Sequence, residues 1–289
     1  MRDNVAFLSF NSLGMRRLLA GLAFLFLLDI HGARAGQVDT VQVYSASMHK
    51  NVPCVVVLPD AYKKRHAGNF PVVYLLHGYS GNYRDWIKNV PELKQYVDEY
   101  HMIAVCPDGA FGSWYFDSPI DSSFRYETFV SGELVSYIDT HFHTLADRQH
   151  RAITGLSMGG HGAMYLALRH TDIFGAVGSM SGGVDIRPFP NNWDIKKRLG
   201  SIEEHPENWE KNTVINLVDS LKNGVLKIAF TDGTSDFFLQ VNRALHEKLL
   251  KLGIDHDYTE RPGGHTWAFW ENALPYQLLF FERFFDGNK

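Results

Sequence analysis

A serine between two glycines is the residue whose setting most clearly suggests chemistry. Residues 155–159 are Gly-Leu-Ser-Met-Gly, with Ser157 at the centre. In a Gly-x-Ser-x-Gly turn between a strand and a helix, the serine hydroxyl is held exposed as a nucleophile. An apolar run over 151–154 precedes the turn, and an Ala-, Leu- and Met-rich stretch over 158–170 follows it. We predict Ser157 as a nucleophile, the alternative being an ordinary turn with a capping serine.

A nucleophilic serine needs a base and a carboxylate that orients the base. In proteins whose nucleophile lies on such a turn, the acid follows the serine in the sequence, and the histidine follows the acid. Asp232 and Asp236 lie in one loop, and His265 follows the turn Pro262-Gly263-Gly264. His265 is the predicted base. Spacing alone leaves both aspartates open as the acid.

The negative charge that develops on the substrate oxygen needs hydrogen-bond donors. One donor is expected from the residue after the nucleophile, Met158, and the other from the loop after the third strand. That loop begins His77-Gly78-Tyr79. Because Gly78 lets the chain turn, the backbone N–H of Tyr79 is the predicted second donor; the alternative is a plain glycine turn.

These residues must be positioned by a scaffold, and the pattern of apolar runs predicts which one. Strands are predicted at 52–58, 72–76, 102–106, 151–154, 176–177, 225–230 and 256–261, and helices at 127–141, 158–170 and 239–252. Strands that alternate with helices, and that are apolar throughout, predict an α/β fold with a mostly parallel sheet. The polar stretch 185–222 is predicted to be an excursion over one end of the sheet, at the substrate rim.

Composition excludes several classes of protein. The 289 residues are 45% hydrophobic and 21% charged, with a formal net charge of −4. Such a chain can bury a core, and without a basic tract it is not expected to bind nucleic acid. Its two cysteines, Cys54 and Cys106, lie in or beside strand-like runs and are predicted to be buried free thiols, with a disulfide as the alternative. No zinc site is expected.

The first 35 residues have the pattern of an export signal. Arg16 and Arg17 precede an apolar run over 18–28, and Ala33-Arg34-Ala35 matches a cleavage site. The run is too short to span a membrane, and a buried helix is the alternative. We predict cleavage after Ala35, a translation start at Met1 or Met15, and a single mature domain over 36–289 that is periplasmic or extracellular and not inserted in a membrane.

Four motifs together resemble the esterase D-like branch of the α/β-hydrolases, which includes tributyrin, feruloyl and acetyl esterases. They are His77–Tyr83, Gly155–Gly162, Gly233–Phe237 and Pro262–Trp267. The resemblance implies a parallel sheet covered by helices on both faces and places the acid on Asp236. It also implies a nucleophile at Ser157, a base at His265 and an oxyanion hole at Tyr79 and Met158. Trp114 and Tyr115 resemble a segment that lines the substrate site; an aromatic core is the alternative.

The predicted function is that of a secreted serine carboxylesterase. Its expected substrates are short-chain acyl or hydroxycinnamoyl esters, either small molecules or groups linked to polysaccharide, and no cofactor is expected. The alternatives are a thiol-esterase similar to S-formylglutathione hydrolase, a secreted acyltransferase similar to the mycolyltransferases, and a catalytically silent carbohydrate-binding relative. The oligomeric state is not predicted.

Overall fold

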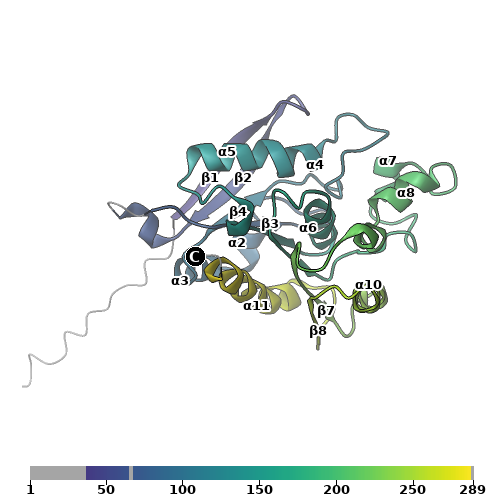
Figure 1. Cartoon of the computed structure of the whole chain (residues 1–289). Coiled ribbons are helices and arrows are strands. Elements are labelled where there is room, and N and C mark those ends of the chain that lie inside the picture. Colours follow the sequence, from purple (N-terminus) through teal and green to yellow (C-terminus); the bar gives the residue numbers. More distant parts are fainter. Residues whose placement is uncertain (1–36, 65–67, 288–289) are drawn as a thin grey trace, which may run out of the picture. The chain divides into compact units, whose positions relative to one another are not determined.

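A sheet of eight strands forms the centre of the computed structural model, which describes residues 37–64 and 68–287 (Figure 1). The strands are β1 (Gln37–Ser45), β2 (Lys50–Leu58), β3 (Val72–Leu76), β4 (Ile103–Pro107), β5 (Arg151–Gly155), β6 (Ala176–Met180), β7 (Lys227–Gly233) and β8 (Asp257–Arg261). Their order in the sheet is β1-β2-β4-β3-β5-β6-β7-β8. β2 is antiparallel to both β1 and β4, and the strands from β4 to β8 run parallel. The predicted α/β fold with a mostly parallel sheet is confirmed.

Helices connect the strands and cover the sheet. The α-helices are α2 (Asp85–Asn89), α3 (Leu93–Glu99), α4 (Tyr126–Thr128), α5 (Val135–His141), α6 (Met158–Arg169), α7 (Ile195–Leu199), α8 (Pro206–Asn212), α9 (Val214–Leu217), α10 (Leu239–Lys251) and α11 (Trp267–Asp286). A π-helix, η2 (Phe129–Leu134), joins α4 to α5, and short 3₁₀ turns are η1 (Asp60–Lys63), η3 (Arg148–His150) and η4 (Val218–Ser220).

Two apolar cores lie on the two faces of the sheet, as the uninterrupted apolar runs of β3, β4 and β5 require. One core packs under η2, α5, α6 and α10, and the other under α2, α3 and α11. In Figure 1, α5 and α11 accordingly lie on opposite sides of the sheet. Cys54 belongs to the first core and Cys106 to the second, so the two thiols face away from each other. Both are buried and free, as predicted.

Several elements have no counterpart among the predicted ones, including the short helices α2 and α3, the edge strand β1 and the last helix α11. β1 is an edge strand with polar, partly exposed residues, so its sequence lacks the apolar run of the central strands. α11 continues through an internal proline, Pro275, although proline usually ends a helix. The helix predicted over 127–141 is present, but it widens into the π-helix η2 between α4 and α5.

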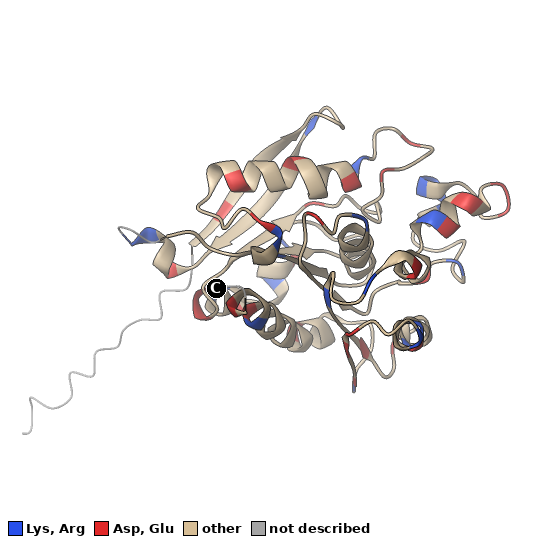
Figure 2. Ribbon diagram, in the orientation of Figure 1, with Lys and Arg blue, Asp and Glu red and all other residues tan. Residues whose placement is uncertain are grey.

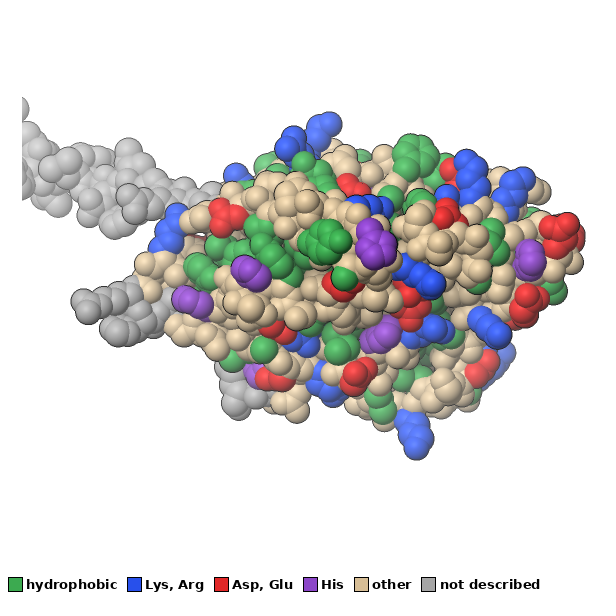
Figure 3. Space-filling view, turned by 90° about the horizontal axis from the view of Figure 1, so that it is seen from above, with side chains coloured by type: hydrophobic (Ala, Val, Ile, Leu, Met, Phe, Trp, Pro, Cys, Tyr) green, Lys and Arg blue, Asp and Glu red, His purple; other side chains and the backbone are tan. Residues whose placement is uncertain are grey.

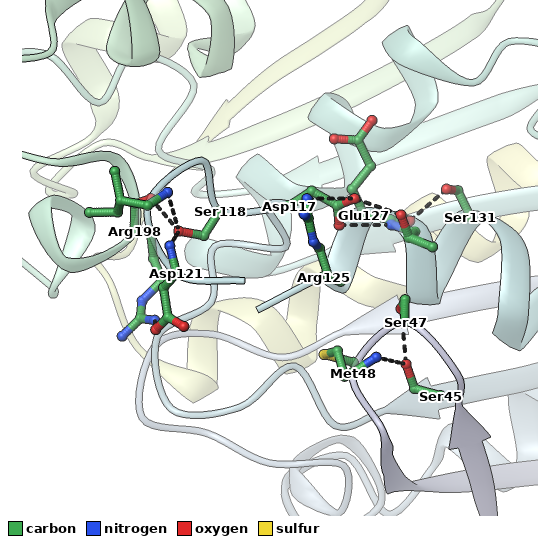
Figure 4. Close-up of polar contacts among 12 residues, drawn as sticks. Ser45, Ser47, Met48, Asp117, Ser118, Asp121, Arg125, Glu127, Ser131 and Arg198 are labelled. Carbon is green, nitrogen blue, oxygen red and sulfur yellow. Dashed lines mark hydrogen bonds and ion pairs between the residues drawn. The ribbon is translucent and has the colours of Figure 1, made fainter. Parts of the chain in front are cut away.

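The segment between β6 and β7, which contains α7, α8 and α9, corresponds to the predicted excursion 185–222. It is tied to the loop before α4 by two contacts of Arg198, shown in Figure 4: Ser118 Oγ donates to its carbonyl (2.6 Å), and its guanidinium pairs with Asp121 (2.7 Å). We call residues 185–222 the rim segment.

Charges of both signs are interspersed along the described chain (Figure 2) and over the face shown in Figure 3. Over residues 37–64 and 68–287, no helix has the length and apolar character needed to cross a bilayer. The predicted export signal over residues 1–35 lies outside the described residues.

Candidate active site

Ser157 lies at the sharp turn between β5 and α6. Its φ is +55° and its ψ is −119°, a strained backbone conformation for a residue other than glycine. The turn is possible because glycines let it approach β3: a Cβ at Gly155 would lie 2.7 Å from the Leu76 carbonyl oxygen, and one at Gly159 would lie 2.6 Å from that of His77. The Ser157 N–H donates to the carbonyl of Met180 (2.9 Å), which ties the turn to β6.

His265 reaches the serine from the loop between β8 and α11. Its Nε2 lies 2.8 Å from Ser157 Oγ, and its Nδ1 lies 2.8 Å from Asp236 Oδ2. Since an ionised carboxylate only accepts hydrogen bonds, Nδ1 carries the proton and Nε2 accepts from the serine hydroxyl. Residues far apart in the sequence are thus brought into one hydrogen-bonded line.

The structure distinguishes the two aspartates by their contacts. The Asp236 side chain is fully buried; its Oδ1 accepts from the N–H of Phe238 (2.9 Å), which leaves Oδ2 for His265. Asp232 instead accepts from its neighbour Gly233 and from the Asn242 amide (2.6 Å). Burial, and then the nearby charge of Asp236, raise the pKa of the Asp232 carboxyl to about 8.

One predicted oxyanion donor, Met158, follows the serine in the sequence, and the other, Tyr79, belongs to a loop beside it. Among the described residues, no acceptor contacts the backbone N–H of Tyr79 or that of Met158. The loop that carries Tyr79 lies against the nucleophile, because a Cβ at Gly78 would be 3.4 Å from Ser157 Cβ.

Both ring nitrogens of His77 form hydrogen bonds that hold this loop in place. Its Nδ1 donates to the Gly78 carbonyl (2.8 Å), and its Nε2 accepts from the N–H of Gly109 (2.7 Å). Burial lowers the pKa of the His77 imidazole, which agrees with the neutral tautomer that these two bonds require. The sequence motif includes His77, but nothing in the sequence alone indicates this supporting role.

Trp114 and Tyr115 do not line the site, and the prediction that they bind substrate is wrong. They are 1% and 0% exposed, so a substrate cannot reach either ring. Tyr115 donates its hydroxyl to the His77 carbonyl (3.1 Å), and Trp114 donates its indole N–H to the carbonyl of Trp193 (3.0 Å). The pair belongs to the core and supports residues that lie nearer the site.

Other aromatic residues pack on the histidine, or on the residues next to it and to the serine. Phe237 packs on the His265 ring, and Trp193 of the rim segment stacks on Phe237. Tyr79 packs against Phe111, whose side chain is 58% exposed. These residues come from four different loops, so no linear motif could have grouped them.

Comparison with known proteins identifies the chain. A model of the family described as "Putative esterase" matches residues 45–281. The chain belongs to this family. The esterase is 28% identical over 260 residues to the acetyl esterase of Caldicellulosiruptor saccharolyticus, a match that covers 81% of this chain and 94% of that protein.

A solved ferulic acid esterase superimposes on the esterase with a TM-score of 0.74 at 29% identity, covering 86% of this chain and 98% of that one. The endo-1,4-beta-xylanase/feruloyl esterase of Xylanibacter ruminicola is 28% identical over 242 residues. That match covers 75% of this chain but 31% of the longer protein. The predicted membership in the α/β-hydrolases is therefore confirmed, and the esterase is a carboxylester hydrolase.

Proposed function

We propose that the esterase cleaves carboxylic esters through an acyl-enzyme intermediate formed on Ser157. The serine Oγ attacks the ester carbonyl while His265 Nε2 takes its proton. As the tetrahedral intermediate collapses, His265 returns that proton to the leaving alcohol and the acyl group stays on Ser157. Water, deprotonated by His265, then attacks the acyl-enzyme; the bond between the acyl carbon and Ser157 Oγ breaks, His265 returns the proton to Oγ, and the carboxylic acid leaves.

The observation that carries this proposal is the pair of 2.8 Å contacts that join Ser157, His265 and Asp236. The contact with Asp236 keeps the His265 proton on Nδ1, which leaves Nε2 able to accept the serine proton. The N–H groups of Tyr79 and Met158 are the proposed donors to the oxyanion. One such donor is typically worth about 10²–10³ in rate.

We propose short-chain acyl or hydroxycinnamoyl esters on carbohydrate as the substrates. The support comes from the names of the relatives, an acetyl esterase, a ferulic acid esterase and a xylanase/feruloyl esterase. The aromatic side chains around the serine and histidine are suited to a planar acyl group or a sugar ring. Export directed by residues 1–35, followed by a single mature domain over 36–289, would bring the esterase to extracellular polymers.

The test is to replace Ser157 with alanine and to use Ser136→Ala, a change of an exposed serine on α5, as the matched control. Ser157→Ala should abolish hydrolysis of p-nitrophenyl acetate and labelling by a fluorophosphonate probe, whereas Ser136→Ala should retain both. Near-normal turnover by Ser157→Ala would reject the mechanism.

A panel of substrates separates the candidate functions. Methyl ferulate and acetylated xylan should be cleaved more efficiently than tributyrin and S-formylglutathione. Preference for S-formylglutathione would favour the thiol-esterase, and acyl transfer to a sugar in place of water would favour the transferase. Binding of xylan without fluorophosphonate labelling would indicate a silent relative.

A further inference from the structure

We propose that Phe237 is a positioning residue for His265, and that its ring stabilises the imidazolium formed when the serine is deprotonated. This inference rests on the proposed function, because it assumes that His265 is the base. Phe237 is next to Asp236 in the sequence, and half of its side chain is exposed.

The geometry places the Phe237 ring over the imidazole. The two ring centroids are 4.2 Å apart, and the planes are inclined by 35°. The face of an aromatic ring carries partial negative charge and attracts a cation that lies within about 6 Å. Phe238 and Trp270 contact the imidazole at nearly perpendicular angles, 76° and 88°, with centroids 5.5 Å and 4.9 Å away. His265 thus lies among three aromatic rings, of which Phe237 is the nearest and the closest to parallel.

The rim segment keeps Phe237 in this position although the residue is exposed. Trp193 stacks on Phe237 with the planes only 19° apart. Trp193 is itself fixed, since its carbonyl accepts from the buried Trp114. The next residue, Asp194, accepts a hydrogen bond from Tyr79 (3.2 Å). Trp193, Phe237 and His265 therefore form a continuous stack from the rim segment to the imidazole.

The polar groups that contact His265 do so at the edges of its ring. Asp236 contacts the Nδ1 edge, and Ser157 contacts the Nε2 edge. Asp232 bonds to Gly233 and Asn242, and Asp194 pairs with Lys197. Among the three aromatic rings that contact the imidazole, Phe237 has the shortest centroid distance and the smallest inclination.

The imidazolium exists only after the serine proton has moved, so its stabilisation lowers the barrier without strengthening substrate binding. The effect of Phe237 should therefore appear in kcat and not in KM. It should also appear in the pH profile, because a ring face that favours the protonated imidazole changes the pH at which the base becomes available.

The experiment compares Phe237→Leu with Phe237→Trp, and uses Tyr44→Leu as the control for loss of an exposed aromatic residue. Leucine keeps apolar bulk but has no ring face, whereas tryptophan restores one.

Phe237→Leu should lower kcat for p-nitrophenyl acetate by about two- to thirtyfold, the range expected for a cation–π contact. KM should stay within about twofold, and the acid limb of the kcat/KM profile should move to lower pH. Phe237→Trp should restore both, and Tyr44→Leu should change neither.

Two results would overturn the inference. A higher KM with unchanged kcat would show that Phe237 contacts the substrate and does not act on His265. A lower kcat with no change in the acid limb of the pH profile would show that Phe237 acts only through packing. Thermal melting of each variant shows whether the fold is intact. If Ser157→Ala remains active, the proposed function itself fails; if Ser157→Ala is inactive and Phe237→Leu behaves like the native esterase, only the present inference fails.

Discussion

Asp232 lies at the end of β7 and Asp236 in the loop that follows, yet their carboxylates have different partners. Asp236 directs one oxygen to His265 and the other to a backbone N–H, while Asp232 bonds to Gly233 and Asn242. Burial, and then the nearby Asp236, raise the pKa of the Asp232 carboxyl to about 8, which favours its neutral form. The environments of the two residues therefore differ: Asp236 contacts the imidazole, whereas the surroundings of Asp232 favour its neutral form.

This difference predicts opposite outcomes for two equivalent substitutions. Asp236→Asn should lower kcat by about 10²–10⁴-fold, because an amide in place of the carboxylate favours the wrong tautomer of His265. Asp232→Asn should leave kcat within about tenfold of the native value, since Asp232 does not contact the imidazole. Steady-state kinetics with p-nitrophenyl acetate checks both, and the reverse ranking would assign the acid to Asp232.

How much of the site the sequence predicts depends on how local each feature is. The turn at Ser157 and the glycine loop before His265 are encoded by neighbouring residues, so both positions could be predicted. Spacing could not choose between Asp232 and Asp236, because that choice depends on which carboxylate points across the edge of the sheet. The buried positions of Trp114 and Tyr115 are likewise set by contacts with distant segments, and their aromatic character alone suggested a binding role.

The elements that hold the site could be predicted where they are buried on both faces. Strands buried on both faces, such as β3 and β5, have continuous apolar runs and lie close to their predicted bounds. β1 has only one strand beside it and partly exposed residues, so it lacks such a run. In α11, Pro275 and apolar residues on several sides obscure the helical period, and only the adjacent sheet shows why the helix persists.

The close approach of β3 to the turn between β5 and α6 predicts that glycine is required at position 159. A Cβ there would meet the backbone carbonyls of Leu76 and His77, which cannot move without displacing β3. Gly159→Ala should destabilise the esterase by about 1–3 kcal/mol, as overpacking does, and should lower kcat because the turn also positions Met158. Urea unfolding and kinetics measure the two effects.

Gly132 in η2 is the matched control, because a Cβ at this position would meet no atom within 4 Å. Gly132→Ala should be neutral or should stabilise the fold by about 0.4–1 kcal/mol, through lower entropy of the unfolded chain. Equal unfolding midpoints for the two variants would contradict the steric argument.

At the scale of the whole molecule, Glu127 joins elements that are distant in sequence. This buried residue of α4 accepts hydrogen bonds from Tyr165 and Arg169 of α6 and from His170. The Tyr165 hydroxyl also lies 2.9 Å from Asn212 of α8, which brings the rim segment into the same network. Figure 4 shows Glu127 beside the loop that carries Asp117 and Ser118.

The same network predicts how stability depends on pH. Burial alone would raise the pKa of Glu127, but the bonds from His170, Tyr165 and Arg169 outweigh burial and lower the pKa from 4.5 to about 2. A carboxylate with a lowered pKa stabilises the folded state at pH values above the pKa it has in the unfolded chain. This contribution is lost as the pH falls toward the pKa of the folded state.

Glu127→Gln should therefore be less stable than the native esterase by about 1–3 kcal/mol at pH 7, and this difference in stability should shrink between pH 4.5 and 2. Urea midpoints of both proteins at several pH values test this, and a gap that stays constant down to pH 2 would show that Glu127 does not stabilise the fold through its charge.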